Sequence, residues 1–195
     1  MIPLIGLTGG IGAGKSTALE ALRRLGADCL STDRVVHELY ESADVRDAVT
    51  DHFGPSVLAD GSINRPALAK LAFANDAERS WLEQLLWPRV GARVQAWHAA
   101  ALEAAPPPRA AVVEVPLLFE SGLDRGYDAT IAVIADEQVR RQRALGRGHE
   151  ALPERSARQL SQQEKSQRAT YTVINDGDVP ELEAKLSAIL DMLHR

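Results

Sequence analysis

Short apolar runs alternate along this chain with longer segments in which apolar residues recur at helical spacing. The runs at residues 110–119 and 128–135 are apolar over most of their length, which is typical of strands in a parallel sheet covered by helices. The alternation predicts an α/β fold with a central parallel sheet of about five strands. We expect strands at residues 2–7, 27–30, 110–119, 128–135 and 170–175, and helices at residues 15–26, 136–148, 153–168 and 178–195.

Two segments do not fit this alternation and are expected to stand outside the sheet. Residues 45–105 are mostly helical in pattern, and Pro88 is expected to start, break or kink a helix there. The rigid stretch "APPPR" at residues 105–109 ends this block. The sequence therefore predicts one domain over residues 1–195, with a core at about 1–33, 109–137 and 169–195, a helical insertion at about 34–108 and an arginine-rich lid at about 138–168.

Composition narrows the class of protein. The formal charge of -5 argues against a general nucleic-acid binder, whose binding surface is usually basic. The one cysteine, Cys29, cannot form an intramolecular disulfide, which indicates a reducing compartment. No run approaches the ~20 apolar residues of a membrane span, and the first residues lack the pattern of a signal peptide. We expect a cytoplasmic protein with neither a nucleic acid nor a membrane as partner.

The stretch "GLTGGIGAGKST" carries the strongest chemical signal. Gly9, four further residues and then Gly14-Lys15-Ser16 fit the pattern G-x-x-x-x-G-K-[ST], between an expected strand and an expected helix. In such a loop the backbone amides and the helix N-terminus converge on phosphate oxygens. The lysine reaches the β- and γ-phosphates, and the hydroxyl of Ser16 ligates Mg²⁺. The motif predicts a three-layer P-loop fold that binds a nucleoside triphosphate with Mg²⁺. The expected contacts are Gly10, Ile11, Gly12, Ala13, Gly14, Lys15, Ser16 and Thr17.

Other residues separate the classes of P-loop protein. A GTPase should carry N-K-x-D, whereas Asn175-Asp176-Gly177 lacks the lysine, and Glu114 has no acidic neighbour of the kind found in motor ATPases. A small-molecule kinase needs a carboxylate for the acceptor hydroxyl and cations for the transferring phosphoryl group. Asp33, just past the second expected strand, is either that carboxylate or a helix N-cap. Six arginines form either a lid over ATP or a solvated helix face, namely Arg140, Arg141, Arg143, Arg147, Arg155 and Arg158.

The segments "GLTGGIGAGKS", "TDRVVHELY", "VVEVPLLFE" and "RALGRG…ARQLSQQ…VIND" together resemble the dephospho-coenzyme A kinase family over nearly the whole chain. That family transfers the γ-phosphate of ATP to the ribose 3′-hydroxyl of dephospho-CoA, the last step of coenzyme A synthesis. The spacing in the second half is the most specific part of the resemblance. Arg143 and Arg147 match the family's paired lid arginines, and Arg158, Gln162 and Asn175 follow without a gap.

The resemblance implies a role for each matching residue. Lys15, Asp33 and Arg143 are expected to be catalytic, and Asp33 matches the proposed base for the 3′-hydroxyl. Arg147 and Asn175 are expected to contact ATP, and the helical insertion to hold dephospho-CoA. The residues expected to bind dephospho-CoA are Asp33, His37, Arg65, Glu114, Pro116, Leu117, Leu118 and Glu120.

The chain departs from the family pattern mainly on the acceptor side. Ser31-Thr32-Asp33 stands where the family usually has D-A-D, and Glu114 replaces an aspartate. Asn64 stands in place of the aspartate in the family's Ile-Asp-Arg segment, and Trp87 in place of the histidine in its His-Pro pair. The resemblance implies a dephospho-CoA kinase that uses Mg²⁺-ATP, as a monomer or small homo-oligomer. The alternatives are a nucleoside or nucleoside-monophosphate kinase with the same core, and a nucleotide-binding switch without an acceptor.

Overall fold

A computed structural model describes residues 2–145 and 159–194 of the chain. The chain divides into two compact units. One comprises Met1–Ser31 and His98–Arg195, and the other comprises Thr32–Trp97. None of the helices in the described ranges is both long enough and apolar enough to cross a membrane.

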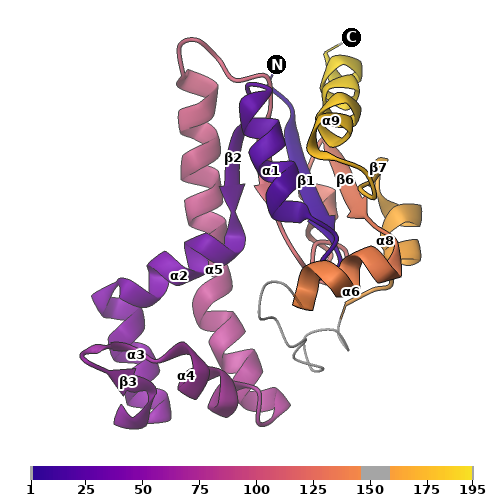
Figure 1. Ribbon diagram of the computed structural model, residues 1–195. Coiled ribbons are helices and arrows are strands. Elements are labelled where there is room, and N and C mark those ends of the chain that lie inside the picture. The colour runs from indigo at the N-terminus through magenta and orange to yellow at the C-terminus, as the bar shows by residue number, and fades with distance from the viewer. Residues whose placement is uncertain (1, 146–158, 195) are drawn as a thin grey trace. The chain divides into compact units, whose positions relative to one another are not determined.

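The first unit is built on a parallel five-stranded sheet in the order β2-β5-β1-β6-β7 (Figure 1). This confirms the predicted α/β fold with its central parallel sheet. All five strands run the same way, so their carboxyl ends share one edge, where ligands bind in open sheets of this kind. The strands are β1 (Leu4–Gly9), β2 (Asp28–Ser31), β5 (Ala111–Glu114), β6 (Ala129–Ile134) and β7 (Tyr171–Ile174).

The two faces of the sheet are covered by different parts of the first unit. Side chains alternate between the faces of a strand. Ile5 and Leu7 of β1 therefore join the hydrophobic core with α1 and α9, whereas Gly6 contacts Leu118 and Thr8 contacts Lys165 of α8. The helices lying wholly in this unit are α1 (Lys15–Arg24), α6 (Glu137–Leu145), α8 (Gln162–Arg168) and α9 (Val179–Leu193), with a 3-10 turn η2 (Leu123–Gly126).

Local sequence signals account for where several of these helices begin. Asp178 caps α9 by accepting a hydrogen bond from the Glu181 amide. Ser161 and Glu164 form a reciprocal capping box at the start of α8, which satisfies amide groups that a helix N-terminus leaves without partners. The Ser161 amide and hydroxyl both donate to the Glu164 carboxylate at 2.8 Å, and these two hydrogen bonds lower the pKa of that carboxyl.

The second unit is mostly helical, but it also contains a two-stranded hairpin. Its strands are β3 (Leu58–Ala59) and β4 (Ser62–Ile63), and the turn residues Asp60 and Gly61 both have positive φ. An Asp-Gly pair is a strong hairpin signal that the reading of this block as helical overlooked. The other elements are α2 (Thr32–Glu41), α3 (Ala43–Phe53), the 3-10 turn η1 (Pro55–Val57), α4 (Arg65–Ala72) and the first part of α5 (Asp76–Glu103).

Helix α5 runs through Pro88. The predictions that a helix starts or breaks at this proline are therefore wrong. Proline lacks the amide that would bond four residues back, and its ring crowds that turn. At the next residue, the Arg89 side chain donates to the Leu85 carbonyl at 2.7 Å and supplies a hydrogen bond beside the proline. Arg89 also forms an ion pair with Asp44.

Candidate active site

The loop between β1 and α1 folds as the glycine motif predicts, and two glycines make close contacts that no other residue would permit. A Cβ at Gly14, whose φ is +92°, would lie 2.1 Å from the Asn175 side-chain nitrogen. A Cβ at Gly12, whose φ is +75°, would lie 2.6 Å from the Arg140 carbonyl oxygen. Glycine adopts these left-handed conformations without steric cost. The loop is therefore packed tightly against α6 and the segment after β7.

The start of α1 is suited to an anion. Gly14 is the N-cap residue and supplies no side-chain cap, the first turn holds no acidic residue, and Arg23 and Arg24 lie in the last turn. The amides and dipole of such a helix end attract phosphate. Lys15 Nζ donates to the Gly9 carbonyl at 2.9 Å and to the Gly10 carbonyl at 3.2 Å, which places the ammonium within the loop.

Asn175 and Arg140, from distant parts of the sequence, bond to this loop, and Arg143 in turn bonds to Asn175. The Asn175 amide donates to the Ala13 carbonyl at 2.9 Å, and Arg143 donates to the Asn175 carbonyl at 2.8 Å. Arg140 donates to the Ile11 carbonyl at 2.9 Å. The structure thus brings the predicted residues Arg143 and Asn175 to the phosphate loop. Of the other predicted lid residues, Arg141 pairs with Glu137 within α6, and Arg147, Arg155 and Arg158 lie outside the described residues.

A cavity of about 370 Å³ adjoins the loop. Its volume falls within the ordinary range of small-molecule sites. One wall comes from the phosphate loop and the start of α1, and the other from α6 and the segment that joins β7 to α9. The lining residues are Gly12, Gly14, Thr17, Arg143, Asn175, Gly177, Asp178 and Val179. A nucleotide whose phosphates lie in the loop would have its base and sugar near this cavity.

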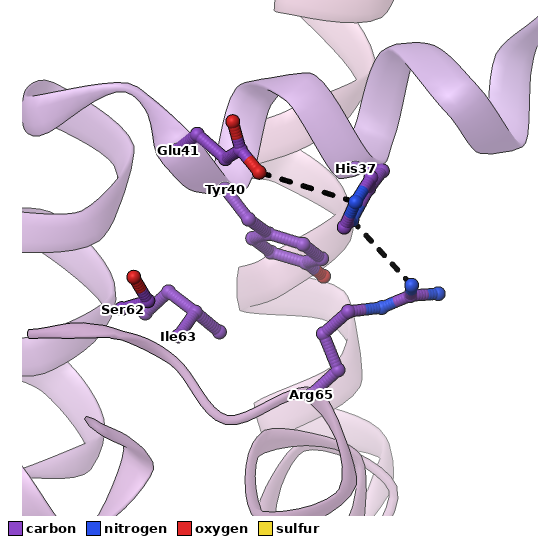
Figure 2. A pocket seen from close by; sticks show the side chains of 6 residues that line it. All are labelled: His37, Tyr40, Glu41, Ser62, Ile63 and Arg65. Carbon is purple, nitrogen blue, oxygen red and sulfur yellow. Dashed lines mark hydrogen bonds and ion pairs between the residues drawn. The ribbon is translucent and has the colours of Figure 1, made fainter. Parts of the chain in front are cut away.

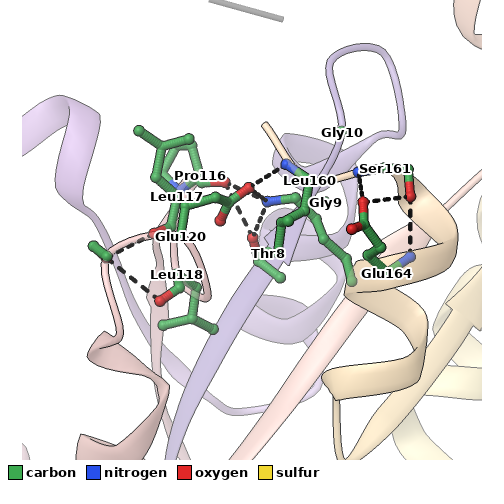
Figure 3. A network of polar contacts seen from close by, with 12 residues as sticks. Thr8, Gly9, Gly10, Pro116, Leu117, Leu118, Glu120, Leu160, Ser161 and Glu164 are labelled. Atoms are coloured by element: carbon green, nitrogen blue, oxygen red, sulfur yellow. Dashed lines mark hydrogen bonds and ion pairs between the residues drawn. The ribbon is translucent and has the colours of Figure 1, made fainter. Parts of the chain in front are cut away.

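The segment after β5 forms a polar network beside the phosphate loop (Figure 3). The Pro116 carbonyl accepts from the Thr8 hydroxyl at 3.2 Å and from Lys165 Nζ at 2.7 Å. Glu120 forms an ion pair with Lys165 at 2.9 Å, and the same carboxylate oxygen accepts from the Leu160 amide at 2.8 Å. Thr8, Pro116 and Leu160, from three segments of the chain, therefore contact Lys165 or its partner carboxylate.

The predicted acceptor-binding residues of this segment differ in how deeply they are buried and in their hydrogen bonds. Leu118 is buried against Gly6, and Glu114, at the end of β5, is also buried. Leu117 is half-buried, and its carbonyl accepts from the Ser121 hydroxyl at 2.6 Å. Glu120 Oε2 is buried with no hydrogen-bond partner among the described residues. A contact between these residues and a substrate stays a prediction.

The second unit has its own pocket, of about 120 Å³ (Figure 2). It brings together two predicted acceptor-binding residues, because Arg65 Nη1 lies 3.5 Å from His37 Nδ1. His37 Nε2 lies 3.9 Å from a carboxylate oxygen of Glu41. Asp33 is exposed in the first turn of α2, one helical turn before His37 and hence on the same face. The complete lining is His37, Tyr40, Glu41, Ser62, Ile63 and Arg65.

The residues are also compatible with Mg²⁺ bound together with a nucleotide. Mg²⁺ keeps several waters and is commonly held by a few protein oxygens and the phosphates of the substrate. Ser16 offers an exposed hydroxyl in the first turn of α1. Within residues 2–145 and 159–194, no three His, Cys, Asp or Glu side chains converge as a metal-binding group. The Ser16 hydroxyl is therefore a donor that fits a metal delivered with the nucleotide.

Sequence reasoning missed one residue of this region, Lys165. It is the largest side chain that is fully buried in the described structure, and it lies within the polar stretch "QQEKSQR". Nothing in that stretch separates a buried lysine from a solvated one. The preceding capping box could have located the helix but not its buried face.

Comparison with known proteins identifies the family. The sequence model for dephospho-CoA kinase matches residues 3–181. The chain belongs to the dephospho-CoA kinase family. A dephospho-CoA kinase from Deinococcus radiodurans is 41% identical over 192 residues, covering 97% of this chain and 91% of the relative. One from Moorella thermoacetica is 38% identical, covering 98% of this chain and 92% of the relative.

Solved structures agree with this fold. A crystal structure of a protein from Thermus thermophilus aligns with a TM-score of 0.83 at 32% identity, covering 98% of each chain. A dephospho-CoA kinase from Campylobacter jejuni aligns with a TM-score of 0.71 over 99% of this chain and 98% of that one. Its identity is 24%, so this second likeness supports the fold alone.

Proposed function

We propose that this dephospho-CoA kinase family member transfers the γ-phosphate of ATP to the ribose 3′-hydroxyl of dephospho-CoA. The observation that carries the proposal is the phosphate loop, held by Arg143 and Asn175, in a chain that matches the family over nearly its whole length. In the reaction, a bond forms between the 3′-oxygen and the γ-phosphorus, and the bond from that phosphorus to the bridging oxygen breaks. The hydroxyl loses its proton, and ADP leaves.

On the phosphate side of the site, the proposal gives roles to three groups. Lys15 and the amides at the start of α1 bind the β- and γ-phosphates, and Arg143 stabilises the charge that develops during transfer. Ser16 is the residue that would hold Mg²⁺, which supplies further neutralisation of phosphate charge when bound with ATP. Arg147 belongs to the same proposal as a second cation on ATP.

The acceptor side assigns complementary roles. Asp33 accepts or orients the proton of the 3′-hydroxyl, and His37 and Arg65 bind the nucleotide part of dephospho-CoA. Support for this grouping comes from the second unit itself, where His37 and Arg65 line one pocket and Asp33 lies one helical turn away. Positioning and neutralisation of charge supply most of the acceleration in phosphoryl transfer. The residues of segment 114–120 would add contacts beside the phosphate loop.

An acceptor panel tests this function. ADP release is measured with Mg²⁺-ATP and one of dephospho-CoA, adenosine, adenosine monophosphate, shikimate or no acceptor. We expect rapid release with dephospho-CoA alone, and a product that carries phosphate at the 3′-position. Phosphorylation of a nucleoside or nucleotide but not of dephospho-CoA would support the alternative kinase. Equal turnover with and without every acceptor would support a nucleotide-binding switch.

The cellular setting is part of the same proposal. We infer a cytoplasmic enzyme that acts on small molecules, as a monomer or small homo-oligomer. The single cysteine supports a reducing compartment, because it leaves no partner for a disulfide within the chain. Light scattering of the purified protein measures the oligomeric state directly.

A further inference from the structure

Lys165 is a fully buried lysine in a short polar helix. Its side chain is 0% exposed, although lysine is almost never buried without a partner. Its ammonium has three donor positions and contacts three oxygens, those of Pro116 at 2.7 Å, Glu120 at 2.9 Å and Thr8 at 3.2 Å. The group is therefore satisfied within the protein.

The partners of Lys165 lie at the edge of the sheet that carries the phosphate loop. Thr8 directly precedes Gly9, the first glycine of the motif, and the carbonyls of Gly9 and Gly10 accept hydrogen bonds from Lys15. Pro116 lies two residues beyond the end of β5. A displacement of Thr8 would therefore also shift the next residues of the chain, whose carbonyl oxygens bind Lys15.

The charge of Lys165 also has a specific counterpart. Glu120 is 11% exposed and is the carboxylate that pairs with the lysine. Burial lowers the pKa of Lys165, and the hydrogen bond and charge of Glu120 oppose that shift. Removing one member of a buried pair leaves the other charge uncompensated. Because Glu120 Oε2 already lacks a partner among the described residues, loss of the ammonium would leave the Leu160 amide as the one described donor to the carboxylate.

We propose that Lys165 is a positioning residue for phosphoryl transfer, which acts with Glu120 to hold the start of the phosphate loop against the segment at residues 116–120. The inference rests on the proposed function and goes beyond it, because neither the glycine motif nor the lid spacing includes Lys165. Lys165 acts through Thr8 and Pro116, not by contact with ATP. Its effect should therefore fall on kcat more than on the KM for ATP, since small misplacements of reacting groups cost rate steeply.

The test uses the full-length enzyme with Lys165→Met and Lys165→Arg. Methionine keeps an unbranched apolar side chain but removes the charge and all three hydrogen bonds, whereas arginine keeps a cation that donates several. We expect Lys165→Met to lower kcat by about 10- to 100-fold and to change the KM for ATP by less than about 3-fold. Lys165→Arg should recover most of the lost kcat.

Leu186→Ala is the matched control for a merely structural role. Leu186 is 0% exposed in α9, on the face of the sheet opposite Lys165, and its truncation destabilises the same unit. Activity is measured at a temperature where circular dichroism shows each variant folded. We expect the control to lower the melting temperature and leave kcat within about 2-fold of wild type. A Lys165→Met variant that loses stability but keeps the wild-type kcat would overturn the proposal.

Two further measurements keep the outcome clear. If Lys165→Met does not fold, Glu120→Gln replaces it, because glutamine keeps the shape and an acceptor oxygen while removing the charge. A wild-type kcat in a folded Glu120→Gln variant would then contradict the proposed role of the Lys165–Glu120 pair.

ATP hydrolysis without acceptor is measured in parallel. If wild-type protein ignores dephospho-CoA, the proposed function fails, while loss of hydrolysis in Lys165→Met but not in Lys165→Arg would still support the positioning role.

Discussion

The two pockets of this protein are built in opposite ways. Around the phosphate loop, buried or half-buried side chains bond to backbone carbonyls at 2.8 to 2.9 Å, as Arg140, Arg143 and Asn175 do. In the helical unit, Arg65 and His37 lie 3.5 Å apart and His37 and Glu41 3.9 Å apart, with the latter two side chains 52% and 74% exposed. One site is organised by folding, and the other consists of charged groups near water.

The difference follows from what each site is proposed to bind. Triphosphate binding needs donors that already point at the ligand, because preorganised dipoles need no reorganisation during transfer. An acceptor site of exposed side chains must order them when the ligand arrives, and that ordering costs binding free energy. We infer that the first pocket governs catalytic rate and fold stability, whereas the second governs the affinity for the acceptor.

Replacing Asp33 should have the largest effect. Asp33 is the one residue of the helical unit that we propose takes part in the chemical step. Asp33→Asn should lower kcat by about 10²- to 10⁴-fold, the usual contribution of general acid–base catalysis, and leave the KM for ATP nearly unchanged. Asp44→Asn is the matched control, because Asp44 is also an acid in the first turn of a helix in this unit. Steady-state ADP release measures both. Unchanged turnover in Asp33→Asn would remove this residue from the mechanism.

Asn175→Ala tests the organised pocket. The change removes the side-chain amide that donates to the buried Ala13 carbonyl, and an unsatisfied buried polar group costs about 1–3 kcal/mol of unfolding free energy. We expect this loss in urea unfolding, together with a raised KM for ATP. Asn64→Ala is the counterpart in the helical unit, where Asn64 caps α4. Asn64→Ala should lower the free energy of unfolding by about 1 kcal/mol and leave the KM for ATP unchanged. The same KM for ATP in Asn64→Ala and Asn175→Ala would contradict the proposed difference between the two pockets.

Arg65→Gln tests the exposed pocket. A hydrogen bond from a charged group to phosphate contributes about 1.5–3 kcal/mol, so the KM for dephospho-CoA should rise by about 10-fold or more while the KM for ATP and the melting temperature stay the same. Arg34→Gln removes another exposed arginine of the same unit, which pairs with Glu38. That control should alter neither KM. An Arg65→Gln variant whose main defect is stability would place the residue in the fold instead of the site.

The ionisation of Cys29 gives the smallest effect and reports on the sheet unit, because this one cysteine of the chain lies in β2. Burial raises the pKa of the Cys29 thiol to about 12, whereas an unfolded thiol ionises near about 8.5. The stabilisation is therefore complete below the unfolded pKa and is lost as pH rises toward the folded one. By pH 9.5 the loss should be about 1.4 kcal/mol.

Urea unfolding at pH 7.5 and 9.5 measures this effect. Cys29→Ala should abolish the part of the alkaline loss of stability that comes from the thiol. The smaller side chain also lowers the free energy of unfolding, but equally at both pH values, so this cost cancels when each protein is compared with itself. An equal alkaline loss in both proteins would show that Cys29 does not contribute.

Much of the fold could be predicted because its signals are local. Apolar runs predicted all five strands of the sheet, and the Gly-Lys-Ser segment predicted the loop and the helix that follows it. Two errors were also local. The Asp-Gly pair of the β3–β4 hairpin was overlooked, and Pro88 was given too much weight against the helix-forming residues on either side of it.

The site was less predictable, because several of its contacts join residues far apart in sequence. Asn175 was expected at the nucleotide, and the structure shows its amide donating to the Ala13 carbonyl, 162 positions away. Lys165 gave no signal at all, since a lysine in a polar helix is solvated in most proteins. Only its approach to Thr8 and Glu120 distinguishes it.

The sequence by itself determined the phosphate loop, the α/β alternation and the family, because motif spacing and periodicity are properties of short segments. Tertiary structure decided which side chains surround that loop and how firmly they are held. Whether a polar side chain is exposed or buried depends on which distant segment packs over it. For that reason Gly14 could be recognised in the sequence, but the close contact of Asn175 with it and the burial of Lys165 had to be seen in the folded chain.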